Sequence, residues 1–109
     1  MKTSNKRNSN FGEQLRNLRE VNNYTLKHVS EHIGIDTSLL AKIERNERQP
    51  TKTIIKNVAH FFNVNEKTLH DNFLSDQIAY KIFNEEADLS ILKDAEAKVL
   101  YLKLVQNEK

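Results

Sequence analysis

Two histidines four residues apart form the most recognisable chemical pattern in this sequence of 109 residues. His28 and His32 would lie on one face of a helix. With Glu31 they form an H-x-x-E-H string, in which imidazoles can hold zinc and a carboxylate can act as a base. Gly34 ends that helix after about nine residues, and the chain is too short for a surrounding catalytic domain. We therefore expect no zinc chemistry.

The sequence contains no other set of residues suited to catalysis. Cysteine is absent, no Gly-rich loop could cradle a phosphate, and no nucleophile stands beside a base and an orienting group. No apolar run has the length of a signal peptide or of a bilayer-spanning helix. We expect a cytoplasmic protein that is not an enzyme and that needs no cofactor, metal or membrane.

Helices must position the functional residues, because the sequence has few residues that break helices. It contains only two glycines and one proline, and leucine, lysine, glutamate and asparagine are frequent. Apolar residues recur at helical spacing in five segments between residues 11 and 74. We therefore expect an all-α fold in which five helices over residues 11–74 share one core. The expected N-caps within this region are Thr25, Asp36, Thr51 and Asn65.

The apolar positions of these five helices define the expected core. In the first helix they continue to Val21 and Tyr24, and in the fifth they end at Phe73 and Leu74. The full set is Phe11, Leu15, Leu18, Val21, Tyr24, Leu26, Val29, Ile33, Leu40, Ile43, Ile54, Ile55, Val58, Ala59, Phe62, Leu69, Phe73 and Leu74.

Residues 75–109 are expected to form a C-terminal helical extension. Ser75 is predicted to cap a new helix, and Asp88 to precede a last helix over residues 89–105. The last helix is apolar on two sides, so it needs two partners. One of these sides has the alternating three- and four-residue spacing of a coiled-coil contact, formed by Leu92, Ala95, Val99 and Leu102.

Positive charge is concentrated in the first half of the chain. Residues 1–56 contain 11 Lys and Arg against 6 Asp and Glu, whereas residues 57–109 contain 6 against 9. Residues 1–10 include Lys2, Lys6 and Arg7 and have no apolar period, which predicts a flexible basic arm. The basic half is therefore the candidate for contact with a polyanion.

The second and third predicted helices are short, and the three-residue turn Gly34-Ile35-Asp36 joins them, which is the spacing of a helix-turn-helix. Around this turn, residues 11–74 resemble the lambda-repressor-like, XRE-type helix-turn-helix domain of transcriptional regulators. The matching positions are Leu15, Leu18, Arg19, Thr25, Val29, Ser30, Ile33, Gly34, Ile35, Leu40, Ile43, Glu44, Arg45, Pro50 and Leu69.

The resemblance implies that the recognition helix, residues 37–46, enters the major groove of double-stranded DNA. Lys42 is the expected reader of guanine, and Leu39 either contacts DNA or lies under the second helix. The resemblance also implies an ion pair of Arg19 with Glu44 and a close helix crossing at Ser30. The implied base contacts are Thr37, Ser38, Ala41 and Lys42, and the phosphate contacts are Arg16, Thr25, Arg45, Arg48 and Lys52.

Two residues depart from the family pattern. Leu26 stands where many members use a Gln to contact a phosphate, so that contact is either lost or made only by backbone N–H groups at the helix end. Asn46 replaces a usual Gly after the recognition helix, which is tolerated because Asn enters the left-handed region more readily than most residues.

One such domain makes few base contacts, so specificity requires two copies on half-sites roughly 34 Å apart. We expect a homodimer formed through residues 75–109 that binds a palindromic operator and acts as a repressor or autoregulator. Alternatively, residues 75–109 fold back on their own domain. The rival function is a protein-interaction module, such as the antitoxin of a toxin–antitoxin pair, which engages a protein partner through the same C-terminal helices.

Overall fold

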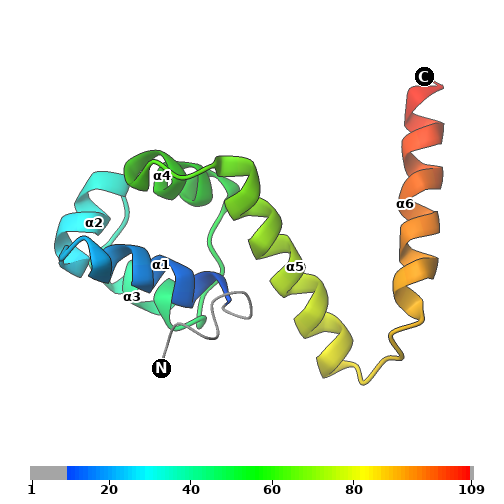
Figure 1. Ribbon diagram of the computed structural model, residues 1–109, viewed down its shortest axis with the longest axis horizontal. Helices are drawn as coiled ribbons and strands as arrows, with labels where there is room; N and C mark the ends of the chain where they lie inside the picture. Colours follow the sequence, from blue (N-terminus) through cyan, green and yellow to red (C-terminus); the bar gives the residue numbers. More distant parts are fainter. Residues whose placement is uncertain (1–9, 109) are drawn as a thin grey trace. The chain divides into compact units, whose positions relative to one another are not determined.

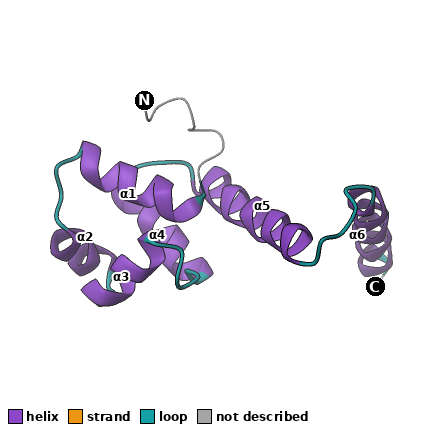
Figure 2. Cartoon of the chain, turned by 90° about the horizontal axis from the view of Figure 1, so that it is seen from below, coloured by secondary structure: helices purple, strands orange, loops and turns teal. Residues whose placement is uncertain are grey.

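The computed structural model describes residues 10–108, and in that range the chain forms six α-helices and no strand (Figure 1, Figure 2). The all-α prediction is confirmed. None of the described helices is long and apolar enough to cross a membrane. The chain divides into two compact units, whose boundary follows Asp76. The helices are α1 (Phe11–Val21), α2 (Leu26–Ile33), α3 (Thr37–Glu44), α4 (Lys52–Phe62), α5 (Glu66–Asn84) and α6 (Ile91–Asn107).

The first unit is built around one apolar core to which α1 to α5 all contribute. Val21 and Leu74 were expected in this core but are 66% and 43% exposed. Val21 lies in the last turn of α1, and the inward line of α5 runs through Leu69 and Phe73 and leaves Leu74 outside it. The buried apolar residues all lie at predicted positions: Phe11, Leu15, Val29, Ile33, Leu40, Ile43, Ile54, Ile55, Val58, Ala59 and Leu69.

At the start of four helices, a polar side chain caps the helix by accepting a hydrogen bond from a backbone N–H of the first turn. The predicted caps Thr25, Thr51 and Asn65 are confirmed, with accepted bonds of 2.8 to 3.1 Å. Asn10, expected in the N-terminal arm, caps α1 in the same way, and the rest of that arm lies outside the described residues. Asp36 occupies the N-cap position of α3, but its side chain makes no capping hydrogen bond.

Residues in the left-handed region end five of the described helices. In each case the next residue donates its backbone N–H to the carbonyl five residues earlier, as Glu47 does to Lys42 at 2.9 Å. This is the Schellman arrangement, which satisfies carbonyls that a helix end leaves free. At three of these five helix ends asparagine takes the left-handed conformation that glycine usually takes. The left-handed residues are Asn23, Gly34, Asn46, Asn63 and Glu86, with φ between 54° and 79°.

The second unit consists of the end of α5, a short turn and α6. The prediction that Ser75 begins a new helix is wrong, because α5 runs without a break from Glu66 to Asn84. The Ser75 hydroxyl donates to the carbonyl of Asn72 at 2.9 Å, so it is satisfied inside the helix. α6 begins at Ile91 and ends at Asn107, two residues later at each end than predicted, and none of its side chains is buried.

An ion pair fixes α3 to α1, as predicted. Arg19 Nε and Nη2 donate to the two carboxylate oxygens of Glu44 at 2.7 and 3.0 Å, and Nη1 donates to the carbonyl of Tyr24 at 3.1 Å. The side chains of Arg19 and Glu44 are only 14% and 5% exposed. The hydrogen bond that Arg19 donates to Glu44 raises the pKa of Arg19, although burial opposes this effect. A bidentate pair removed from water in this way is costly to break.

The start of α1 also lies directly against the backbone at the end of α3. A Cβ on Gly12 would lie 2.5 Å from the carbonyl oxygen of Glu44 and 2.6 Å from that of Ile43, so only glycine fits without displacement. The Asn46 side chain joins the same junction. Its Oδ1 accepts the Gly12 N–H at 3.2 Å, and its Nδ2 donates to Asn10 Oδ1 at 2.8 Å.

Asp76 connects α5 to the start of α1. Its Oδ2 accepts the backbone N–H of Phe11 at 2.6 Å, and the Phe11 ring meets Phe73 edge-on at 5.8 Å. Burial raises the pKa of Asp76, the bond from Phe11 opposes this, and the charge of Glu13 adds to the increase. The effect of burial on the pKa of Asp76 is therefore larger than that of the hydrogen bond that the carboxylate accepts.

The contacts of Asn46 predict how replacement by glycine changes stability. Asn46→Gly and Asn63→Gly both relieve a left-handed asparagine, but only Asn46 makes side-chain hydrogen bonds with other described residues. We expect Asn46→Gly to be less stable than Asn63→Gly by about 1–2 kcal/mol in urea unfolding. Equal changes for the two variants would show that the Asn46 side chain does not hold the junction.

The raised pKa of Asp76 predicts a pH dependence of stability. Because its pKa is raised, Asp76 binds a proton more tightly in the folded state than in the unfolded state. Protonation of Asp76 therefore stabilises the folded state at low pH, and this stabilisation is lost as pH rises through the folded pKa. Asp76→Asn keeps an acceptor for Phe11 but does not ionise. We expect the free energy of unfolding of the variant relative to the parent to rise between about pH 4 and 7. An unchanged difference across that range would contradict the assignment.

Candidate nucleic-acid interface

The two helices of the predicted helix-turn-helix, α2 and α3, pack against each other across the turn at Gly34. Ser30 lies at their crossing and is 1% exposed, which confirms the need for a small residue there. The Ser30 hydroxyl donates to the carbonyl of Lys27 at 3.1 Å and lies 2.9 Å from Thr37 Oγ1. Since Ser30 has a single hydroxyl proton, Thr37 donates in the second bond. Thr37 Oγ1 is thus left as an acceptor for any further partner.

α3 has one face in the core and one face outside it. Leu40 and Ile43 are almost fully buried, and α3 packs against both α1 and α2. Leu39 is partly buried against the core, which supports its interpretation as a packing residue rather than a DNA contact. The predicted base-contacting residues lie together on the remaining face: Thr37, Ser38 and Lys42 are exposed, and Ala41 is half-buried between them.

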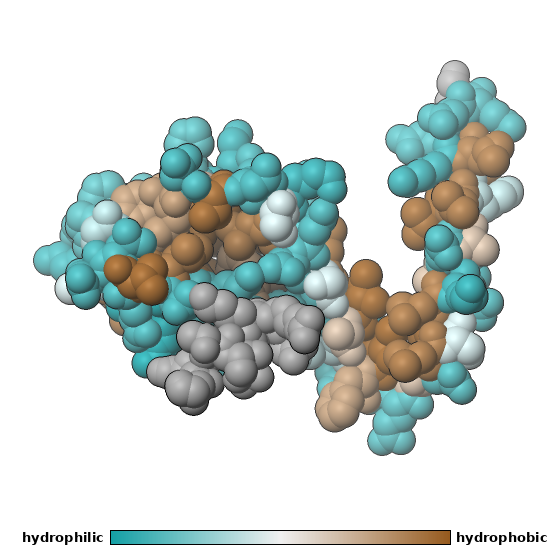
Figure 3. Space-filling view, in the orientation of Figure 1, coloured by the Kyte–Doolittle hydropathy of each residue, from teal (hydrophilic) through white to brown (hydrophobic). Residues whose placement is uncertain are grey.

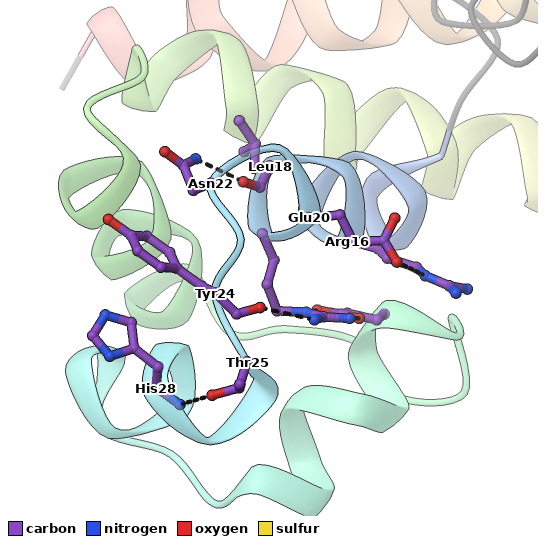
Figure 4. Close-up of polar contacts among 9 residues, drawn as sticks. Arg16, Leu18, Glu20, Asn22, Tyr24, Thr25 and His28 are labelled. Carbon is purple, nitrogen blue, oxygen red and sulfur yellow. Dashed lines mark hydrogen bonds and ion pairs between the residues drawn. The ribbon is translucent and has the colours of Figure 1, made fainter.

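The predicted phosphate contacts fall into two groups. Arg48 and Lys52 are exposed, follow α3 in the chain, and form no ion pair among residues 10–108. Thr25 is exposed at the N-terminus of α2, where its Oγ1 accepts the N–H of His28 (Figure 4). A helix N-terminus adds partial positive charge there.

Arg16 and Arg45 already have carboxylate partners, which the sequence analysis missed. Arg16 Nε donates to Glu20 at 3.0 Å along α1 (Figure 4), a pair that the four-residue helical spacing could have predicted. Arg45 donates to both oxygens of Glu47, at 2.9 and 3.0 Å. Their two-residue separation outside a helix gives no such signal. To reach a phosphate, each arginine must release its carboxylate partner or bind the carboxylate and the phosphate at the same time.

The histidines of α2 belong to a stack of aromatic rings. The His28 and His32 rings lie 4.4 Å apart, and His32 packs on Phe61 of α4 at 5.0 Å. His32 Nδ1 is 2.9 Å from the carbonyl of His28. Among residues 10–108 no group of three or more His, Asp or Glu is placed to hold a metal ion. Leu26, beside them, packs its side chain against the core instead of offering a polar group.

Comparisons with known proteins agree with this arrangement. A family described as a helix-turn-helix domain matches residues 12–72. The uncharacterized HTH-type transcriptional regulator YazB of Bacillus subtilis (strain 168) is 32% identical over 59 residues, which cover 54% of this chain and 86% of YazB. The biofilm master regulator SinR, solved in complex with DNA, is 28% identical with a TM-score of 0.50, covering 54% of this chain and 95% of that one.

A further likeness extends beyond the helix-turn-helix. A chain of the SinR–SinI complex matches with a TM-score of 0.52 over 85% of this chain and 97% of its own, at 19% identity, and so shows the fold alone. This chain belongs to the helix-turn-helix family of DNA-binding transcriptional regulators.

Proposed function

We propose that this regulator binds a palindromic operator in double-stranded DNA as a homodimer, and that it acts as a repressor or autoregulator in the cytoplasm. The observation that carries the proposal is the two-sided character of α3. One face is locked in the core, and the other presents Thr37, Ser38, Ala41 and Lys42 to solvent. The 28% identical SinR binds DNA through a domain of this fold, which supports the same use of α3 here.

The chemistry of the exposed face suggests what each residue would read. Lys42 carries a donor suited to the O6 and N7 acceptors of guanine. Ser38 can donate or accept, whereas Thr37 gives its proton to Ser30 and can therefore only accept, as from the amino group of adenine or cytosine. The Ala41 methyl is suited to a thymine methyl. This face has no arginine, so each half-site would supply limited discrimination.

Phosphate contacts would fix the position of α3 in the groove. Arg48 and Lys52 form no ion pair among residues 10–108, and Thr25 lies at the N-terminus of α2. We therefore propose these three residues as the primary phosphate anchors. Arg16 and Arg45 are secondary anchors, because each must first be released from a carboxylate. Binding built on such contacts weakens steeply as salt rises.

Limited discrimination by one half-site makes pairing of two copies important. The second unit exposes large apolar side chains along α6 and the end of α5 (Figure 3). Leu92, Val99 and Leu102 are 44%, 49% and 63% exposed, and with Ala95 they form the proposed dimer contact. A surface of this kind, on a helix with no buried side chain, is suited to a second copy of the same helix.

A protein-interaction module is the second candidate function, because the same exposed apolar side chains could receive a different protein. The fold shared with a chain of the SinR–SinI complex is compatible with this candidate but gives no identity to a partner. DNA reading by α3 can coexist with a protein partner on α6, whereas a second copy of the chain and a different partner would compete for the same α6 side chains.

Substitutions on α3 test the DNA-reading proposal. Lys42→Ala should weaken binding to an operator duplex selected by the parent chain by about 5- to 150-fold for each half-site, because one guanine contact contributes about 1–3 kcal/mol. Ser38→Ala should lower the affinity further in the double variant. Fluorescence anisotropy at fixed salt measures both. Lys67→Ala on α5 removes the same charge outside the proposed interface, and an equal loss in that control would contradict base reading by Lys42.

A substitution on α6 tests the dimer. Val99→Lys places a charge in the proposed contact and should convert a dimer to a monomer in sedimentation equilibrium. Asp94→Lys, on α6 but outside the contact residues, should leave the dimer intact. If the parent chain is itself monomeric at concentrations that saturate the operator, the dimer proposal is wrong and α6 is left for another partner.

A further inference from the structure

Glu47 is a charged residue at the proposed interface to which the proposed function gives no role. It follows the recognition helix, and both of its carboxylate oxygens accept from Arg45, at 2.9 and 3.0 Å. The two side chains are 55% and 54% exposed, so the pair lies at the surface and in reach of an approaching polyanion. A phosphate would bind the Arg45 guanidinium through the same bidentate pair of hydrogen bonds.

The backbone fixes Glu47 at this place. Asn46 is left-handed at φ 62°, and the Glu47 N–H donates to the carbonyl of Lys42 at 2.9 Å. The side chain of Asn46 is itself bonded to Asn10 and Gly12 of the α1 end. The backbone of Glu47 therefore cannot be displaced without opening the end of α3.

The charge of Glu47 acts on two proposed DNA contacts. The hydrogen bond from Arg45 is the largest effect on the pKa of Glu47 and lowers it, burial opposes this, and the attraction of Arg45 and then of Lys42 adds smaller decreases. The carboxylate is thus ionised at neutral pH and lies within electrostatic reach of both cations. A negative charge at this position also repels a phosphate that approaches the end of α3.

We propose that Glu47 limits sequence-independent DNA binding by holding Arg45 away from the phosphates. This inference rests on the proposed function, since it assigns a regulating residue to the same interface. Non-specific binding depends almost entirely on phosphate neutralisation, so occupation of one arginine by an internal carboxylate restrains it directly. The operator complex has additional base contacts and depends less on that arginine.

The test is a double-mutant cycle on a duplex that lacks the operator. Glu47→Gln should raise affinity about three- to tenfold at about 0.1 M salt and should steepen the salt dependence by about one released ion, because Arg45 becomes available. Arg45→Gln alone should weaken binding slightly, because Glu47 is left unpaired, and in that background Glu47→Gln should give a clearly smaller gain than in the parent. Asp71→Asn, which removes a paired carboxylate from α5, is the matched charge control and should change affinity less than about twofold.

Three results would overturn the inference: no gain with Glu47→Gln, an equal gain in the Arg45→Gln background, or an equal gain with Asp71→Asn. Binding of the parent chain to its operator duplex separates this inference from the proposed function. If the parent binds the operator and Glu47→Gln has no effect, only the role of Glu47 is wrong. If the parent binds neither duplex, both are wrong.

Discussion

The bidentate pair of Arg19 and Glu44 is the interaction on which the first unit depends. Glu44 is the one charged residue that is buried among residues 10–108, and an ionised carboxylate in that position requires a partner. The guanidinium supplies it and also satisfies the carbonyl of Tyr24, beyond the end of α1. The pair therefore connects three parts of the chain: α1, the turn that follows it, and the end of α3. Removal of either partner alone would leave an unpaired charge in the core.

This attachment determines how α3 can be used. The ion pair, the close approach at Gly12 and the side chain of Asn46 all hold the C-terminal end of α3 against α1. The N-terminal half is held by Leu40 in the core and by the bond between Thr37 and Ser30. The outward face is thereby held although, among residues 10–108, the side chains of Ser38 and Lys42 form no hydrogen bond or ion pair, which is the arrangement that a preorganised reading surface needs. The constraint is structural, and the contact with DNA is the proposal built on it.

Much of this structure could be predicted from the sequence, because it follows from local patterns. Helical spacing identified every buried apolar residue, and Thr25, Thr51 and Asn65 were recognisable as caps. Features that depend on tertiary approach were not predicted. Gly12 has a neutral helical context in the sequence, and its role appears only where α1 meets the carbonyls of α3. Ser75 resembles a cap, but its hydroxyl bonds back to the helix that contains it. The pairing of Arg45 with Glu47 depends on the left-handed turn at Asn46.

The central claim is that the exposed face of α3 reads a two-fold symmetric DNA sequence. Selection of duplexes from a random pool by the full chain tests this most directly. We expect enrichment of a palindrome whose half-site centres lie about one helical turn, roughly 34 Å, apart. A pool that binds in a salt-dependent way but shows no enriched sequence would contradict operator recognition and would reduce the interface to sequence-independent phosphate binding.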